Sequence, residues 1–406
     1  MRPRGQWQSP PERAIVERVT THRVPTVGWV LSGGAARGAY EAGVLRFVLV
    51  DLARQLGRPT WPDVVSGTSV GALNGVFAAA RDAAGVRALS TLWQTMTIGD
   101  VFRFEPARVL RRVLRPRPGE EFGVLDPAPL HAIVARLFPE LALRQAIDSG
   151  ATQAFIVAAT EVATGFNALF VDGEARVPAQ PGSRVYRTQM TGAHCRASAA
   201  IPFVFPPVAV DGRFHVDGGL RQNTPLRPVL ASSVRRALIV GVKRDREEEA
   251  VDLEQEPGVR AAQETPGIFF LAGKMLNALM LDPVERDIWS AEYRNRLVAW
   301  GERRFGRDFS ASAATDIGLH AVDIVYLRPS ADLGRVAGET FRSRPPKTTR
   351  AVRFLLERIV GATGEVEADF LSYLYFDRDY TGQLEALGYE DARRAEEAIA
   401  RLYRED

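Results

Sequence analysis

Two strand-turn-helix units follow one another in the first part of the chain, and they strongly limit the folds that it can adopt. Each unit begins with a short apolar run, at about Val27 to Leu31 and at about Asp63 to Ser66, and then passes through a glycine-containing turn. Mostly apolar helices are predicted to follow, from about Ala39 to Leu56 and from Val70 to about Asp82. Strands that alternate with helices favour a parallel sheet with helices on both faces. The predicted fold class is therefore α/β.

Further strands are predicted in the rest of the chain. The segments "AFIVAATEV", "NALFVDG" and "RALIVGV" have the length and apolar content of strands, and "PPVAVDGRFHVDGG" predicts a hairpin that turns at Asp211 and Gly212. The segment "AVDIVYLRP" predicts an edge strand that returns to the same sheet. Helices are predicted from about Thr348 to Val360 and within "DARRAEEAIARLYRED".

These signals divide the chain into three parts. Residues 1–25 are predicted to be an N-terminal extension, and residues 26–245 form the predicted core with its mostly parallel sheet. The charged run "KRDREEEAVDLEQEP" then predicts an exposed connection. Residues 246–406 are predicted to be a mainly helical C-terminal region that packs on the same domain.

Charge and cysteine content argue against several classes of function. The net charge is only +3, and just three of the 52 basic residues are lysines. Nucleic acid is therefore not an expected partner. The single cysteine, Cys195, cannot form an intramolecular disulfide. No grouping of histidine, cysteine and carboxylate residues has the spacing of a zinc site, so we expect neither a metal nor another cofactor.

The hydropathy pattern bears on the relation to membranes. No part of the chain contains eighteen consecutive apolar residues, and the first 25 residues lack the apolar core of a signal peptide. We therefore expect no transmembrane segment and no export signal. The expected location is cytoplasmic or peripheral to a membrane.

A serine stands at the turn of the second unit, in the stretch "VVSGTSVGALNG". Ser69 lies between Gly67 and Gly71, the spacing of a nucleophile elbow, in which a sharp strand-to-helix turn projects the serine off the sheet. The glycines are needed because side chains at these two positions would clash. Since this chain contains 35 glycines, the pentapeptide alone does not separate a catalytic serine from a buried turn.

Two other segments place glycine-rich or polar residues at the ends of predicted strands. The loop "LSGGAARG" follows the first strand, and its backbone N–H groups together with a helix N-terminus favour a phosphate or a developing oxyanion. In "FHVDGGLRQNTPL", Asp217 ends a short strand before Gly218 and Gly219. Its carboxylate is predicted to lie at the edge of the sheet where open α/β proteins place their sites. A plain Asp-Gly turn explains that segment equally well.

Together, the three segments resemble the patatin-like phospholipase family. The glycine-rich loop of that family corresponds to Gly33 through Gly38, including Arg37, its elbow to Gly67 through Gly71, and its Asp-Gly-Gly motif to Asp217 through Gly219. The block "ASAAIPFVFPPV", with Ser198, and the residues Asn223 and Pro225 also match that family. The stretch "DFLSYLYFDRDYTGQLEALGYEDA" resembles the C-terminal stretch of longer bacterial relatives. The resemblance implies a three-layer fold with a mostly parallel central sheet between helices and a helical C-terminal extension.

The resemblance also implies a mechanism. Ser69 would be the nucleophile and Asp217 the general base that activates it directly, while the amides of Gly33, Gly34 and Ala35 would hold the oxyanion. The expected activity is hydrolysis of carboxylic esters of lipids or phospholipids, with the acyl chain and head group left open. Ala35 departs from the family pattern, which has a glycine there, and a left-handed conformation at this position would add roughly 1 kcal/mol of strain.

Two other functions remain open at this point. An α/β-hydrolase esterase would use a Ser-Asp-His triad, and His320 is the only late histidine, while His215 stands two residues before Asp217. A non-catalytic protein that binds a nucleotide or a lipid through the glycine-rich loop is the alternative from another class. For a dinucleotide site the loop spacing is degenerate, and the nearest acid, Asp51, falls inside a predicted helix.

A basic amphipathic segment, "DVFRFEPARVLRRVLRPRPGEEF", follows the second unit. Six arginines between Arg103 and Arg117 alternate with apolar residues, which is typical of contact with an anionic lipid surface. A solvated helix face that packs on the core would produce a similar pattern. Peripheral contact with a membrane through this segment is therefore a hypothesis.

Overall fold

The computed structural model describes residues 27–115, 122–232, 234–244, 284–306, 308–360 and 368–404. Three predicted features lie outside these ranges: the N-terminal extension, Arg117, and most of the charged run that follows Val242. The division of the chain into three parts stays a prediction.

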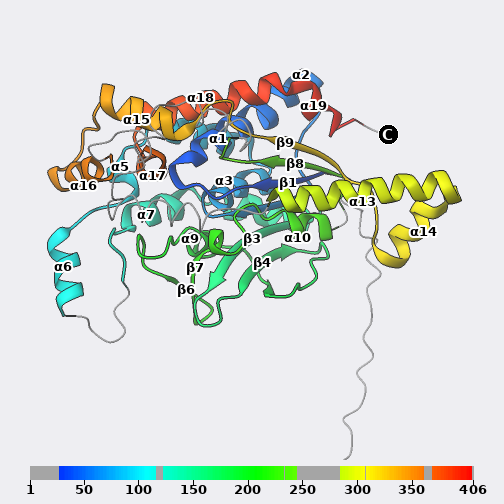
Figure 1. Cartoon of the computed structure of the whole chain (residues 1–406), viewed down its shortest axis with the longest axis horizontal. Helices are drawn as coiled ribbons and strands as arrows, with labels where there is room; N and C mark the ends of the chain where they lie inside the picture. Colours follow the sequence, from blue (N-terminus) through cyan, green and yellow to red (C-terminus); the bar gives the residue numbers. More distant parts are fainter. Residues whose placement is uncertain are drawn as a thin grey trace, which may run out of the picture.

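A mixed sheet forms the centre of the molecule (Figure 1). The order of its main strands is β5-β4-β3-β2-β1-β8-β9, and the β6–β7 hairpin joins it at β3. The strands are β1 Val27–Leu31, β2 Val64–Thr68, β3 Ala154–Glu161, β4 Asn167–Gly173, β5 Ser183–Arg187, β6 Val208–Val210, β7 Arg213–Asp217, β8 Arg236–Val240 and β9 Asp323–Leu327.

Parallel pairing dominates this sheet, as predicted. The neighbours β3-β2, β2-β1, β1-β8, β8-β9 and β4-β5 are parallel, and β4 and β7 pair with β3 in the antiparallel sense. Every residue of β1, β2 and β3 is buried, which explains why apolar residues stand next to one another in these strands instead of alternating with exposed polar ones. The predicted edge strand is β9, and β5 was not predicted.

One of the helices that precede the Asp-Gly-Gly motif is interrupted by a π-helical segment that the sequence did not predict. The long helix expected after the first strand divides into three pieces at Phe47–Leu52. These elements are η1 Ala35–Arg37, α1 Gly38–Arg46, η2 Phe47–Leu52, α2 Ala53–Leu56, α3 Val70–Ala79, α4 Ala83–Thr95, α5 Ile98–Val101, α6 Pro106–Leu114, α7 Ala128–Leu137, α8 Glu140–Asp148 and α9 Gly192–Ser198.

The remaining helices follow the Asp-Gly-Gly motif. The helix predicted near the C-terminus is divided between α18, which begins earlier than expected, and α19. These elements are η3 Gly218–Leu220, α10 Leu226–Ala231, α13 Val284–Phe305, α14 Asp308–Ile317, α15 Leu333–Ser343, α16 Arg350–Val360, α17 Ala368–Leu374, α18 Arg378–Arg394 and α19 Glu396–Arg401.

Two apolar cores lie on opposite faces of the sheet. Trp29, Leu31 and Val65 face a large cluster that includes side chains of α1, α3, α4 and α18. The alternate residues Val30 and Val64 face a smaller cluster with α10 and α13. Successive side chains of a strand point to opposite faces, so the helices of Figure 1 form a layer on each side of the sheet. This is the predicted three-layer arrangement.

The sheet register explains how the candidate residues meet. Since β1 and β2 are parallel neighbours, the loops after Leu31 and Thr68 leave from the same edge. Strand β7 pairs with β3 just beyond the end of β2, because Ala158 pairs with Thr68 and the next residue, Ala159, pairs with Asp217. Strand β4 occupies the other side of β3. The ends of β2 and β7 therefore approach each other head to head.

Candidate active site

Ser69 occupies a sharp turn between β2 and α3. Its backbone has φ 55° and ψ −123°, a conformation that costs free energy for a residue with a side chain. The two flanking glycines allow the close packing of this turn. A Cβ atom at Gly67 would lie 2.5 Å from the carbonyl oxygen of Gly71, and one at Gly71 would lie 2.4 Å from the carbonyl oxygen of Leu31. The sequence has the glycines that this elbow requires.

The strained turn is held by Ser198 at the end of α9. The N–H group of Ser69 donates a hydrogen bond of 2.7 Å to the Ser198 hydroxyl, which in turn donates to the carbonyl oxygen of Ala158 in β3. Ser198 is completely buried. The sequence marked this serine through the family resemblance alone, since no local pattern indicates that it supports the elbow.

Asp217 ends β7 beside the elbow and is completely buried. Its Oδ1 atom accepts a hydrogen bond of 2.7 Å from Gly219 N–H, and its main-chain oxygen accepts one from Thr160. The Oδ2 atom has no hydrogen bond of ordinary geometry with any described residue. Burial raises the pKa of this carboxyl to about 6, although the nearby Ser69 hydroxyl and Gly219 N–H act to lower it. One carboxylate oxygen is thus available beside Ser69.

The glycine-rich loop lies against the same serine. A Cβ atom at Gly33 would be 3.3 Å from the Cβ of Ser69 and 2.3 Å from Asn223 Oδ1. The Gly33 N–H group already donates to the main-chain oxygen of Asn223, and Asn223 Nδ2 donates back to the Gly33 oxygen, both at 3.0 Å. Among the described residues, the amides of Gly34 and Ala35 have no such acceptor. Of the three amides predicted to hold the oxyanion, those of Gly34 and Ala35 therefore remain available.

Ala35 adopts the left-handed conformation, with φ 50°. The departure from glycine at this position therefore places a side chain where glycine is normally preferred. That side chain lines an apolar pocket that Ser69 also borders. Downstream in the loop, a Cβ atom at Gly38 would lie 2.2 Å from a methyl group of Val70, so the start of α1 packs directly on the elbow.

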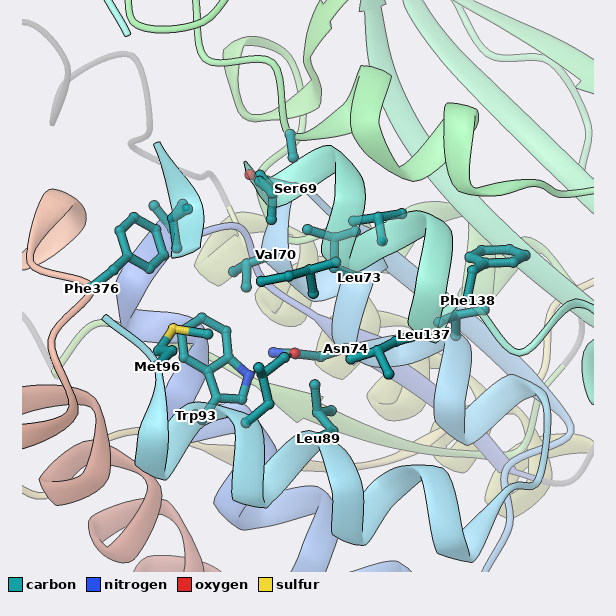
Figure 2. Close-up of a pocket in the computed structure, with 18 of the residues that line it drawn as sticks. Ser69, Val70, Leu73, Asn74, Leu89, Trp93, Met96, Leu137, Phe138 and Phe376 are labelled. Atoms are coloured by element: carbon teal, nitrogen blue, oxygen red, sulfur yellow. Dashed lines mark hydrogen bonds between the residues drawn. The ribbon is translucent and has the colours of Figure 1, made fainter. Parts of the chain in front are cut away.

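An apolar pocket opens beside Ser69, between α3, α4 and α7. Figure 2 shows Ser69, Val70 and Leu73 on one side of this pocket and Leu89 and Trp93 facing them. Among the described residues that line the pocket, Asn74 carries the one side-chain amide, and this amide is fully engaged. Its Nδ2 donates to Gly38 and Glu41, and its Oδ1 accepts from Trp93 Nε1 at 3.1 Å. The pocket therefore offers an apolar surface to a ligand.

Neither of the two histidines considered for a triad joins the site. The His215 ring packs edge-on against Phe170, and neither of its nitrogens has a hydrogen-bond partner among the described residues. His320 Nε2 lies 3.2 Å from the carbonyl oxygen of Val234, which precedes β8. Because β8 and β2 both run parallel to β1, this places His320 at the sheet edge opposite Ser69.

Part of the predicted basic segment, Pro106–Leu114, forms the exposed helix α6. Leu110 and Leu114 are 59% and 69% exposed, so these leucines do not pack on the core. The start of this segment is tied to the body by Arg108, which forms an ion pair of 3.1 Å with Asp126. The nearby Phe203 is 71% exposed and belongs to the same short segment as Phe205, a residue of the apolar pocket.

Other predicted and alternative sites can be placed as well. Asp51 lies in the π-helical segment, where it pairs with Arg54 at 3.0 Å, rather than at the end of a strand. Within the described ranges, no three histidine, cysteine or carboxylate side chains gather as a metal site would require. Every helix in those ranges is too short or too polar to span a lipid bilayer.

Comparison with known proteins gives the following similarities. Residues 29–230 match the model of a family described as patatin-like phospholipase. A patatin-like phospholipase domain-containing protein of Caenorhabditis elegans is 28% identical over 202 residues, which are 49% of this chain but only 12% of that protein. The solved structure of human GIVD cytosolic phospholipase A2 is 13% identical with a TM-score of 0.41, and the match covers 93% of this chain and 60% of that one. For VipD from Legionella pneumophila the identity is 14% and the TM-score 0.31, with 90% and 67% covered.

Proposed function

Since this chain belongs to the patatin-like phospholipase family, we propose that it is a lipid acyl hydrolase that cleaves carboxylic esters through Ser69 and Asp217. One observation carries the proposal: beside a serine on a strained elbow lies a buried carboxylate, one oxygen of which accepts no hydrogen bond of ordinary geometry from the described residues. A nucleophile next to a base, at the end of an apolar pocket, is the arrangement that acyl transfer requires.

In the proposed reaction, Asp217 Oδ2 accepts the proton of Ser69 Oγ as that oxygen attacks the ester carbonyl. The amides of Gly34 and Ala35 stabilise the negative charge of the tetrahedral intermediate. When the intermediate collapses, the carbon–oxygen bond to the alcohol breaks, and the alcohol leaves with the proton from Asp217. Water, activated by the same carboxylate, then hydrolyses the acyl-serine and releases the fatty acid. These steps use no metal and no cofactor.

The apolar pocket supports an acyl chain as the group bound next to Ser69. Its wall is formed by aliphatic and aromatic side chains, and the amide of Asn74 is occupied by protein partners. A charged or sugar-like group would lose its hydration there without gaining hydrogen bonds. The substrate class is therefore proposed to be lipid esters, including phospholipids.

We also propose that helix α6 contacts an anionic lipid surface. Its exposed leucines stand among arginines, and Arg111 and Arg115 are exposed as well. The exposed Phe203 lies in the same region, because its carbonyl oxygen accepts a hydrogen bond of 2.9 Å from Val124 N–H, just before α7. Apolar and basic groups on one exposed helix suit the boundary between lipid chains and anionic head groups.

The test compares variants on a soluble ester, p-nitrophenyl butyrate, and with a fluorophosphonate probe that labels activated serines. Ser69→Ala should abolish hydrolysis and labelling, and Asp217→Asn should lower turnover at least ~100-fold, as expected for loss of a general base. His215→Ala and His320→Ala should retain substantial turnover. Circular dichroism would confirm that the variants are folded.

Three results would contradict the proposal. Full labelling of Ser69→Ala would exclude this serine as the nucleophile. An inactive His320→Ala beside an active Asp217→Asn would instead favour the Ser-Asp-His triad of an α/β-hydrolase. A wild-type protein that neither hydrolyses esters nor reacts with the probe would favour the non-catalytic binding function.

A further inference from the structure

A short C-terminal segment, Asp369–Phe376, reaches the candidate active site from outside the region that matches the family. Helix α17 supplies most of this segment. It packs on η1, the turn of the glycine-rich loop that contains Ala35. The segment thus packs directly on the glycine-rich loop, where it can control how the loop is held.

The contact with the loop is made through Arg37. This side chain is 4% exposed, and its Nε donates a hydrogen bond of 2.8 Å to the Ser372 hydroxyl. Its Nη2 donates to the carboxylate of Asp369, and the guanidinium carbon lies 4.1 Å from the centre of the Tyr373 ring. Three neighbours therefore hold one buried arginine.

Electrostatics favour the charged form of this arginine despite its burial. Burial acts to lower the pKa of the Arg37 guanidinium, but Tyr373 and Asp369 together raise that pKa above its ordinary value. A buried charge that is paired and hydrogen-bonded is costly to disturb, because removing one partner leaves the other uncompensated. The contact is consequently costly to break.

The same segment also reaches the acyl pocket. Phe376 lines the pocket, and its ring stacks on Trp93 with 6.2 Å between ring centres. Figure 2 shows Phe376 at the side of the pocket near Met96. A segment that touches both the glycine-rich loop and the pocket wall occupies two parts of the candidate active site.

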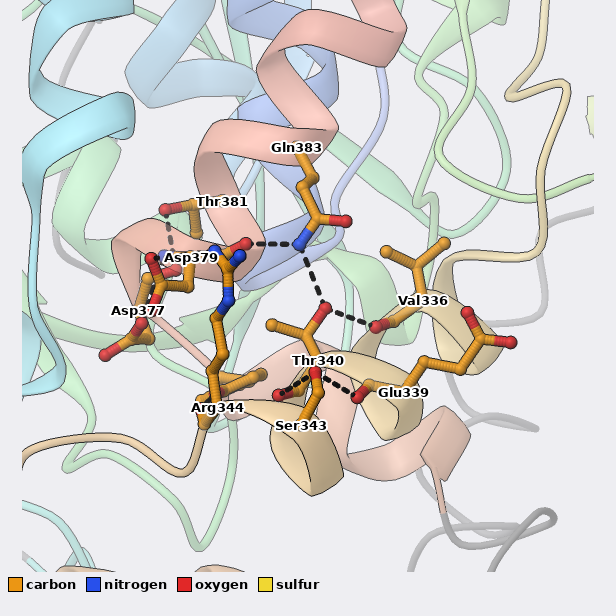
Figure 3. A network of polar contacts seen from close by, with 10 residues as sticks. Val336, Glu339, Thr340, Ser343, Arg344, Asp377, Asp379, Thr381 and Gln383 are labelled. Carbon is orange, nitrogen blue, oxygen red and sulfur yellow. Dashed lines mark hydrogen bonds and ion pairs between the residues drawn. The ribbon is translucent and has the colours of Figure 1, made fainter.

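A polar network holds the chain that follows Phe376. Asp377 caps α18 by accepting a hydrogen bond from Asp379 N–H, and Thr381 donates 2.6 Å to the carbonyl oxygen of Trp93. On the neighbouring turn, Gln383 Nε2 donates 3.0 Å to Thr340 of α15 (Figure 3). The segment is therefore fixed to α4 and α15, so that it can hold Arg37 in place.

We infer that Asp369, Ser372 and Tyr373 form a clamp on Arg37 that positions the Gly34 and Ala35 amides for the oxyanion, so that a C-terminal segment outside the family match is required for turnover. The inference rests on the proposed function. These are positioning residues, since they act through Arg37 and are not proposed to contact the substrate. The physical reason is local: Ala35 has an unfavourable left-handed φ two residues before Arg37, and the loop must be held in that conformation.

The test uses the full chain with Asp369→Asn, Ser372→Ala and the conservative Asp369→Glu. The control is Ser232→Ala, because Ser232 is also a buried serine whose hydroxyl donates to the carbonyl three residues earlier, but it has no part in the clamp. For each variant, kcat and KM on p-nitrophenyl butyrate and the rate of fluorophosphonate labelling are measured, and thermal unfolding is recorded beside them.

Loss of oxyanion alignment affects the transition state more than substrate binding. We expect Asp369→Asn and Ser372→Ala to lower kcat and the labelling rate at least ~10-fold, while KM changes less than ~2-fold. Asp369→Glu should recover part of this loss. The control Ser232→Ala should match wild type. Folded Ser372→Ala and Asp369→Asn proteins with wild-type kcat would overturn the inference alone. Absence of labelling in the wild type would overturn the proposed function and the inference with it.

Discussion

The backbone N–H group of Ser69 donates a hydrogen bond of 2.7 Å to the side chain of Ser198, a residue far away in the sequence. Through the Ser198 hydroxyl, the elbow is connected to the carbonyl oxygen of Ala158 on β3. Because β3 also pairs with Asp217, one strand fixes both members of the proposed dyad. The alignment of the two residues depends on β3 as much as on their own turns.

Replacing Ser198 with alanine should therefore weaken both the fold and the reaction. The change leaves the buried Ser69 N–H group without an acceptor, which typically costs ~1–3 kcal/mol. We expect the free energy of unfolding, measured by urea denaturation, to fall by that amount. Labelling of Ser69 by a fluorophosphonate should slow at least ~10-fold at a temperature where the variant is folded. Unchanged labelling would show that the elbow keeps its shape without Ser198.

The pH dependence of activity should follow Asp217. Burial raises the pKa of this carboxyl to about 6, and only its deprotonated form can accept a proton from Ser69. We expect kcat/KM to be constant above this pH and to fall below it, approaching tenfold for each pH unit. A pH–rate profile on a soluble ester measures the midpoint. A midpoint near 4, the ordinary value for aspartate, would contradict the effect of burial.

The same shift predicts that Asp217→Asn stabilises the protein at neutral pH. The pKa of the folded state, about 6, lies above the ordinary 3.8, so the charged carboxylate destabilises the fold at higher pH. This cost is fully present above about pH 6 and disappears as the pH falls toward 3.8. At pH 8 the variant should be more stable than wild type by up to about 3 kcal/mol, and equally stable near pH 3.8. Urea denaturation at both pH values measures the difference.

Ala35 should tolerate glycine but not a branched side chain. Glycine relieves the left-handed strain of roughly 1 kcal/mol, but it also gives the unfolded chain more conformational entropy, which opposes folding by a similar amount. Ala35→Gly should therefore change the free energy of unfolding by less than ~1 kcal/mol. Its activity should remain within a few-fold of wild type. Ala35→Val should lose more stability and most activity, because β-branched residues strongly disfavour this conformation. Denaturation and ester turnover test both variants.

Reversing the charge of three arginines at the C-terminal end of α6 should affect lipid surfaces selectively. The triple variant with Arg111→Glu, Arg112→Glu and Arg115→Glu should bind and hydrolyse anionic phospholipid vesicles more weakly, while its activity on a soluble ester stays near wild type. Binding of the wild type should weaken with added salt, because exposed charges are screened within about 10 Å at 0.1 M ionic strength. Vesicle sedimentation measures the binding. Equal losses on both substrates would indicate a structural role for this helix.

The sequence by itself determined the features that depend on local chain geometry. Buried parallel strands need continuous apolar runs, and a close strand-to-helix turn needs glycines at Gly67 and Gly71, so both are visible in the order of the residues. The turn at Asp211 and Gly212 is similar, since both residues adopt positive φ in the hairpin. These constraints act over a few residues and leave a readable pattern.

Tertiary structure alone decided which distant groups share an environment. The burial that raises the pKa of Asp217, the pairing of Gly33 N–H with Asn223 and the contact of Arg37 with Ser372 all depend on packing between separate segments. Phe376 had no local pattern that marks a pocket residue, because its role arises only when the C-terminal helices cover α4. A side chain's desolvation and partners depend on what packs around it, and that is set by the whole fold.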